Sequence, residues 1–359
     1  MNIADIEGLI RKHLKRLAAY QPIEPVEVLA GRVAGGRVIK LDGNENPYGC
    51  SPRVRDALAS YPYHNIYPDP EQRELRKALG EYLGLSPESI VAGSGSDELI
   101  DLVLRLFLEP GDRVINCVPT FGMYSFSTGV CGGEVVEVAR ADFAVDVDGV
   151  RRAVDARTKI IFVASPNNPS GNTTPQDHIL ELAGMGPLVV VDEAYAEFSG
   201  TTVLPLVADH PNLIVLRTFS KWAGLAGLRV GYGVFPPRIA AYVMKIKPPY
   251  NVNSAAQVAV LESLKDLDHL RDTVKDIVAE RERLFDRLGK VGFLRPIPSE
   301  ANFVLCLVER GEARSIHRAL AGKGIFIRHF DTPLMERYLR ISVGRPEDTD
   351  ALIEALKEI

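Results

Sequence analysis

Cysteine is scarce in this chain of 359 residues, and the few cysteines are scattered. Cys50, Cys117, Cys131 and Cys306 show none of the paired spacing that disulfide-rich domains and cysteine-ligated metal sites require. The histidines are equally dispersed. We therefore expect a cytoplasmic protein, because a reducing compartment suits such cysteines, and we expect no bound metal.

The chain also lacks a large charge of either sign and any long hydrophobic run. Its net charge is −5 at pH 7 and no basic stripe is interleaved with aromatic residues, so nucleic acid is not an expected partner. No apolar run approaches the roughly 20 residues that span a membrane. The first twenty residues have no apolar signal core and indicate an amphipathic helix with a basic face. We interpret this helix as an arm that packs on a partner subunit; a membrane-surface helix is the alternative.

Two common nucleotide-binding signatures are missing as well. The glycine-rich run GSGS at 93–96 has Glu98 where the third glycine of the dinucleotide fingerprint would stand. The chain contains no Gly-Lys-Ser or Gly-Lys-Thr triplet of a P-loop. A nicotinamide-dependent enzyme and a P-loop nucleotidase are therefore both disfavoured.

What the chain does contain is an alternation of short apolar runs and helical patterns from about residue 50 to residue 247. Such alternation predicts an α/β fold with a mainly parallel sheet between helices. Its strands are expected at 114–115 and neighbouring positions, 134–138, 160–164, 188–191, 213–216 and 229–234. A long helix is expected over 254–288, followed by a smaller α/β unit with strands over 302–308, 325–328 and 338–343 and helices over 313–321 and 348–358. We predict an N-terminal arm (1–29), a large domain (48–253) and a small domain formed by 30–47 together with 254–359.

The run RTFSKWAGLAGLRVGY at 217–232 contains a lysine in unusual surroundings. Most lysines are solvated, but Lys221 follows a buried strand and precedes several glycines, with Arg229 eight residues on. A desolvated lysine beside another cation loses its proton more easily, and a neutral amine can form a Schiff base with an aldehyde. Arg229 would suit a phosphate. The two together suggest pyridoxal 5′-phosphate (PLP) as the cofactor.

Three other strand ends carry groups that PLP needs. Asp192 follows the run 188–191 and either holds a pyridine nitrogen or caps the next helix. The turn 93–96 leads into a helix from Asp97, which makes an anion cradle or a plain tight turn. The rigid loop SPNNPSG at 165–171 presents Asn168, unless it too is only a turn. Their joint occurrence favours one cofactor site over four unrelated features.

With these motifs the chain resembles the fold-type I PLP-dependent aminotransferases of class II, and within them the histidinol-phosphate aminotransferase branch. The matching runs extend over nearly the whole chain: LDGNENPYG (41–49), YPD (67–69), GSDELI (95–100), PTFGMY (119–124), SPNNPSG (165–171), VVDEAYAEF (190–198), TFSKWAGLAGLRVGY (218–232), PPYNVN (248–253), ANFV (301–304) and LRISVG (339–344).

The resemblance implies a role in cofactor binding for each matching position. Lys221 is the Schiff-base lysine and proton shuttle, Asp192 holds the pyridine nitrogen, and Tyr195 and Asn168 hold the phenolic oxygen. Phe121 stacks on the ring, where tyrosine is usual. The phosphate is bound by Ser96, Asp97, Thr218, Ser220 and Arg229, and by Tyr67 of a partner subunit in a homodimer with shared active sites.

The resemblance also implies the substrates, which are small molecules. Arg340 would clamp a carboxylate, Arg328 and Tyr20 would contact the phosphate of histidinol phosphate, and Asn46 would contact substrate. The implied reaction moves an amino group between L-histidinol phosphate, a phosphorylated amino alcohol, and the 2-oxo acid 2-oxoglutarate. An aromatic amino-acid aminotransferase and a phosphothreonine decarboxylase are the alternatives. Trp222, the only tryptophan, either crowds the pocket or fills the core, and we favour the core.

Overall fold

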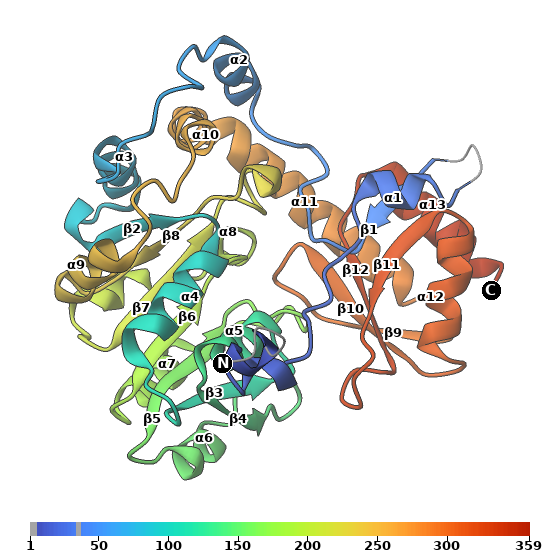
Figure 1. Ribbon diagram of the computed structural model, residues 1–359. Coiled ribbons are helices and arrows are strands. Elements are labelled where there is room, and N and C mark those ends of the chain that lie inside the picture. The colour runs from blue at the N-terminus through green and yellow to red at the C-terminus, as the bar shows by residue number, and fades with distance from the viewer. Residues whose placement is uncertain (1–5, 34–36) are drawn as a thin grey trace.

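Two β-sheets, each covered by helices, lie side by side (Figure 1). The computed structural model describes residues 6–33 and 37–359. Residues 1–5 of the predicted arm, and 34–36 of the segment predicted to join the small domain, lie outside the described residues.

The larger sheet has seven strands in the order β2-β8-β7-β6-β5-β3-β4. All neighbours are parallel except β8, which is antiparallel to both β2 and β7. The strands are β2 (Ile90–Gly93), β3 (Arg113–Val118), β4 (Glu134–Ala139), β5 (Thr158–Ala164), β6 (Leu188–Asp192), β7 (Leu213–Thr218) and β8 (Gly231–Val234). The predicted strand from 229 starts later, because Arg229 has a left-handed φ of 53° and cannot join the ladder.

Helices cover both faces of this sheet. The helices of this part of the chain are α2 (Pro52–Ser60), α3 (Arg73–Leu83), α4 (Ser96–Phe107), α5 (Met123–Cys131), α6 (Val147–Ala153), α7 (Gln176–Ala183), α8 (Ala196–Ser199) and α9 (Pro237–Ile246), with short 3₁₀ turns η3 (Pro87–Ser89), η4 (Leu204–Ala208) and η5 (Ala226–Leu228). Successive strand residues enter opposite cores: Val190 packs in the cluster with Leu99 of α4, whereas Val189 and Val191 pack in the other. Burial on both faces explains why β6 and β7 are continuous apolar runs.

The smaller sheet has five strands in the order β1-β11-β12-β10-β9. They are β1 (Ile39–Leu41), β9 (Leu294–Ile297), β10 (Phe303–Val308), β11 (Ile325–His329) and β12 (Tyr338–Ser342), accompanied by α1 (Val26–Ala30), α12 (Ala313–Gly322) and α13 (Pro346–Lys357). β1 comes from the first part of the chain and pairs in parallel with β11, so it lies blue beside red strands in Figure 1. In the antiparallel pair of β11 and β12, Arg328 stands opposite Arg340.

Two predicted helices differ from the structure. The helix predicted over 254–288 is two helices, α10 (Ser254–Leu264) and α11 (Leu267–Leu288). The break lies at Asp266, whose carboxylate accepts a hydrogen bond from the distant Ser51 hydroxyl, a contact that no local pattern reveals. α10 packs against α2 and α3, whereas α11 packs against the smaller sheet.

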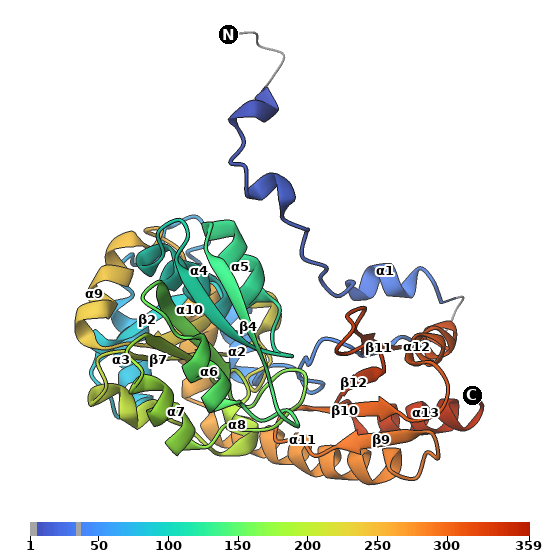
Figure 2. The same ribbon diagram turned by 90° about the horizontal axis from the view of Figure 1, so that it is seen from below.

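The amphipathic helix predicted at the N-terminus is also wrong within the described residues. Only two short 3₁₀ turns form there, η1 (Ile6–Leu9) and η2 (Leu14–Arg16), and neither contains a buried residue. A short helix that buries no apolar face gains little stability in water. Figure 2 shows this segment projecting beyond the body of the protein. In the part of the chain that the structure describes, no helix is both long and apolar enough to cross a bilayer.

Candidate active site

A cavity of about 930 Å³ opens where the carboxyl ends of β5, β6 and β7 face the smaller sheet. The carboxyl ends of parallel strands are the usual ligand-binding edge of such sheets. All predicted site residues line this cavity except Tyr67 and Asn46: Tyr20, Ser96, Asp97, Phe121, Asn168, Asp192, Tyr195, Thr218, Ser220, Lys221, Arg229, Arg328 and Arg340. Segments from the arm, from both sheets and from their loops therefore converge on one site.

Lys221 lies three residues after β7 and is partly buried. Its Nζ donates to the carbonyl oxygen of Gly43 at 3.0 Å. Burial, with the positive charge of Arg340 acting in the same direction, lowers the pKa of this amine to about 8. An amine with this pKa is uncharged, and hence nucleophilic, at mildly alkaline pH.

Asp192 ends β6 and is 5% exposed. The hydroxyl of Tyr124 donates to Oδ2 at 2.7 Å and the amide of Ala194 donates to Oδ1 at 3.1 Å. Burial raises the pKa of this carboxyl to about 6, although both hydrogen bonds oppose the shift. The helix-cap alternative is wrong, because Tyr195 is the N-cap residue of α8. A buried carboxylate of this kind favours a cationic N–H partner.

The turn before α4 lies against Arg229. Helix α4 begins at Ser96, and the guanidinium of Arg229 donates to Asp97 at 3.0 Å beside that helix start. A Cβ at Gly95 would lie 2.5 Å from Arg229 Nη2, and one at Gly231 would lie 2.7 Å from the amide nitrogen of Ser96. Glycine at both positions thus lets an arginine and the positive end of a helix meet, which suits a phosphate.

Two arginines of the smaller sheet line the opposite wall. Arg340 is buried; its Nη1 donates to Asn168 Oδ1 at 2.7 Å, and its Nε has no hydrogen-bond partner among the described residues. Burial lowers the pKa of Arg340 to about 10, so its guanidinium stays charged at neutral pH. Arg328 reaches the arm, donating to the carbonyl oxygen of Gln21 at 3.4 Å. This wall therefore attracts anions.

With this geometry in place, comparison with known proteins identifies the family. The family model described as "Aminotransferase class I and II" matches residues 36–356. The chain belongs to this family. The fold-type I α/β architecture predicted from the sequence is confirmed.

Several similar proteins are named histidinol-phosphate aminotransferase. The histidinol-phosphate aminotransferase of Dehalococcoides mccartyi (strain ATCC BAA-2266 / KCTC 15142 / 195) is 49% identical over 356 residues, 99% of each chain. That of Roseiflexus castenholzii is 50% identical over 368 residues, again 99% of each. Among solved structures, histidinol-phosphate aminotransferase from Sinorhizobium meliloti in complex with pyridoxal-5′-phosphate has a TM-score of 0.88 and 30% identity, covering 97% of this chain and 96% of that one.

Two predicted residues of this aminotransferase lie outside the cavity lining. Asn46 donates to the carbonyl oxygen of Trp222 at 2.9 Å and so holds the residue after Lys221, while the nearby Asn44 lines the cavity. Tyr67 is 78% exposed and stacks on Tyr250 with ring centroids 4.4 Å apart. The structure therefore does not bring these two side chains into the cavity lining.

Trp222 itself is 2% exposed and does not line the cavity. It packs between Tyr82 and Phe219, with ring centroids at 6.2 and 5.4 Å. The interpretation of Trp222 as a core residue is therefore confirmed.

Two residues of the site escaped the sequence analysis. Tyr124 is fully buried, stacks on Phe162 at 4.7 Å and binds Asp192. Asn44 donates to the hydroxyl of Tyr195 at 2.9 Å. Both stand inside runs that carried the resemblance, PTFGMY and LDGNENPYG, and that placement was the only available signal.

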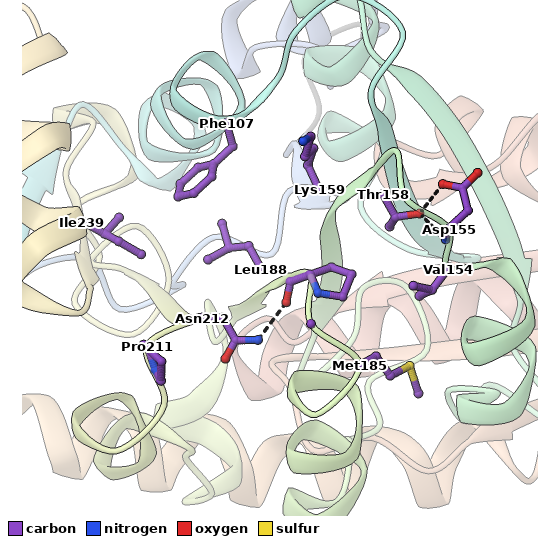
Figure 3. Close-up of a pocket in the computed structure, with 12 residues that line it drawn as sticks. Phe107, Val154, Asp155, Thr158, Lys159, Met185, Leu188, Pro211, Asn212 and Ile239 are labelled. Atoms are coloured by element: carbon purple, nitrogen blue, oxygen red, sulfur yellow. Dashed lines mark hydrogen bonds between the residues drawn. The ribbon is translucent and has the colours of Figure 1, made fainter.

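A smaller cavity of about 390 Å³ lies at the opposite end of the same strands (Figure 3). Thr158 and Leu188, the first residues of β5 and β6, line it. Its polar side chain Asn212 is already bonded within the protein, because it donates to the carbonyl oxygens of Ala183 and Pro187, at 2.8 and 2.9 Å. The chemistry therefore belongs to the larger cavity.

Acetylation of Lys221 in the ligand-free protein should rise with pH with a midpoint near 8, because only the neutral amine reacts. Peptide mass spectrometry after brief treatment with the reagent measures the modified fraction. Lys275 is the internal control, since its hydrogen bond to Asp272 raises its pKa above the usual value. Parallel curves for the two lysines would contradict the assigned environment of Lys221.

Gly95→Ala should weaken PLP binding by about tenfold or more, because the added methyl group displaces the Arg229 guanidinium. Equilibrium dialysis measures the affinity. Gly111→Ala is the matched control: Gly111 also has a positive φ, of 90°, but nothing lies within 4 Å of its Cβ position. Equal losses in the two variants would show that backbone strain, and not the contact with Arg229, matters.

Proposed function

We propose that this chain is a PLP-dependent aminotransferase that moves the amino group between L-histidinol phosphate and 2-oxoglutarate. The observation that carries the proposal is a single cavity with a low-pKa lysine and a buried carboxylate on one wall and two arginines on the other. The names of relatives about half identical over the whole length support the same substrate.

The larger sheet offers each group that PLP requires. Arg229, Thr218 and Ser220 line the cavity together with Ser96, the first residue of α4, and the cofactor's phosphate would bind there. Asp192 would pair with the protonated ring nitrogen, and this positive charge would stabilise the carboxylate that burial disfavours. Phe121 lies in the lining as a flat apolar surface for the ring. When bound, the cofactor supplies the electron sink for the transfer.

The chain's own groups then handle the protons and the substrate. The Lys221 amine can take a proton from the carbon that bears the substrate's amino group, and the Gly43 carbonyl oxygen holds that amine in place. Asp192 keeps the proton on the ring nitrogen. Both roles depend on the exclusion of water that shifts their pKa values.

The two arginines of the smaller sheet explain how one cavity can accept two unlike substrates. Histidinol phosphate carries a phosphate, and 2-oxoglutarate carries two carboxylates. Arg328 and Arg340 stand opposite each other on β11 and β12, and guanidinium forks bind both kinds of anion. Tyr20 reaches the same wall from the arm. Arg328 and Tyr20 together favour a phosphorylated substrate over a plain aromatic one.

The proposal includes a cytoplasmic homodimer whose active sites are shared, with no nucleic acid or membrane partner. Tyr67 is exposed outside its own cavity, which supports a reach into the partner's site. Ile6 and Leu9 of the projecting arm are 72% and 67% exposed, which supports packing of the arm on a second subunit.

The division into an arm (1–29), a large domain (48–253) and a small domain (30–47 with 254–359) stays a prediction. Pairing of β1 with β11 supports the assignment of 30–47. Packing of α10 against α2 and α3 favours a second boundary at the helix break near Asp266.

A half-reaction tests the proposed substrate. PLP-loaded protein is mixed separately with L-histidinol phosphate, phenylalanine and O-phosphothreonine, and absorbance follows conversion of the cofactor to pyridoxamine phosphate. Fast conversion with histidinol phosphate alone is expected. Equally fast conversion with phenylalanine would identify an aromatic aminotransferase, and loss of carbon dioxide from O-phosphothreonine a decarboxylase.

Arg328→Ala should lower kcat/KM for histidinol phosphate about 100-fold and for phenylalanine less than about fivefold, because only the former offers a phosphate to the guanidinium. Steady-state kinetics with both substrates measures the ratio. Arg314→Ala is the control: Arg314 is a nearby cation on α12 that pairs with Asp331 and does not line the cavity. Equal losses for both substrates would assign Arg328 a general carboxylate role.

A further inference from the structure

The tripeptide Asp42–Asn44, just after β1, contacts three residues of the site at once. The carbonyl oxygen of Asp42 accepts from Arg340, and that of Gly43 accepts from Lys221 at 3.0 Å. Asn44 uses its side chain instead: Nδ2 donates to the hydroxyl oxygen of Tyr195 at 2.9 Å. Only this third contact presents a side chain that can be exchanged without moving the backbone.

Asn44 is fixed in one orientation. It is 1% exposed and has a left-handed φ of 52°. Its amide nitrogen donates to the Ser342 hydroxyl, which donates back to Asn44 Oδ1, each at 2.9 Å. Its carbonyl oxygen accepts from Asn302 at 2.9 Å. Because Ser342 occupies Oδ1, the amide group of the side chain can only present its N–H to Tyr195.

This contact determines where the Tyr195 hydroxyl can donate. A phenolic hydroxyl has one proton and accepts through its lone pairs. Asn44 donates to a lone pair of the Tyr195 hydroxyl oxygen, so the hydroxyl proton stays free for another acceptor. Because Tyr195 lines the cavity, that acceptor can be a ligand there. The groups that act electrostatically on this hydroxyl are Arg340, Asp192 and Tyr20, and the Phe303 ring packs edge-on at 5.2 Å.

We propose that Asn44 is a positioning residue that directs the hydroxyl proton of Tyr195 at the phenolic oxygen of the cofactor. The inference rests on the proposed function, since it needs PLP bound with that oxygen near Tyr195. Two residues of the smaller sheet hold Asn44: Ser342 is the last residue of β12, and Asn302 directly precedes β10. Tyr195 follows β6 of the larger sheet, so the direction of its hydroxyl depends on an anchor in the smaller sheet.

The experiment is a spectrophotometric pH titration of the PLP-loaded protein without substrate. Its visible band changes as the lysine–cofactor nitrogen gains a proton. A hydroxyl that donates to the phenolic oxygen stabilises the negative charge there and keeps the midpoint low. Tyr195→Phe removes that donor and should raise the midpoint by about one pH unit.

Asn44→Asp is the decisive variant. Aspartate is nearly isosteric, tolerates the left-handed φ, and can still accept from Ser342. Its second oxygen can only accept, so Tyr195 must turn its proton towards residue 44. We expect a rise of about one pH unit, as in Tyr195→Phe. In the Tyr195→Phe background, Asn44→Asp should add less than about 0.3 unit, because both changes remove the same hydrogen bond.

One further variant excludes a simple effect of charge. Asn44→Gly removes the side-chain donor without adding a charge, and glycine tolerates the left-handed φ of 52°. It frees the Tyr195 hydroxyl to turn away from the phenolic oxygen and should raise the midpoint, which also serves if Asn44→Asp does not retain PLP.

The outcomes separate the inference from the proposed function. A shift in Tyr195→Phe without a shift in either Asn44 variant would overturn the role of Asn44 and leave the aminotransferase proposal intact. A full additional shift from Asn44→Asp in the double variant would likewise overturn it. Absence of any visible band from the wild-type protein would reject the PLP proposal itself.

Discussion

Removal of charged groups from water is the constraint on which this site depends. Asp192, Lys221 and Arg340 all lie at the meeting of the two sheets, and burial shifts the pKa of each towards its uncharged form. Such an arrangement costs stability unless a ligand supplies the missing counter-charges. A cofactor with a cationic ring nitrogen, an aldehyde and a phosphate complements these groups, so the burial that disfavours their charged forms also favours cofactor binding.

The two sheets contribute different residues to the site, and their topology explains which. The larger sheet gathers its ligands at the carboxyl ends of parallel strands, where β6 and β7 stop at Asp192 and Thr218. The smaller sheet contributes two arginines from adjacent strands, and register places them side by side. Both sheets thus bring arginines to the cavity between them: Arg229 precedes β8 of the larger sheet, and the other two belong to the smaller sheet.

The sequence predicted the strands best where burial on both faces made them continuous apolar runs, as in 160–164, 188–191 and 213–216. Most of the residues that it assigned to the site line the cavity, partly because motifs mark strand ends and partly because the chain resembles a known family. Contacts between distant segments were beyond it: Ser51 with Asp266, and Tyr124 with Asp192, have no local signature. The sequence analysis also did not single out Asn44, which lines the cavity, since alternation along an irregular loop does not tell which side chain faces it.

The buried position of Trp222 has an optical consequence. It is the only tryptophan of the chain, is shielded from water and is bonded directly to Lys221. Its emission therefore arises from one environment, next to the amine that would carry an absorbing ring. Energy transfer from the indole to that ring, over so short a separation, would quench the tryptophan emission. The emission intensity of Trp222 therefore reports cofactor occupancy without any label.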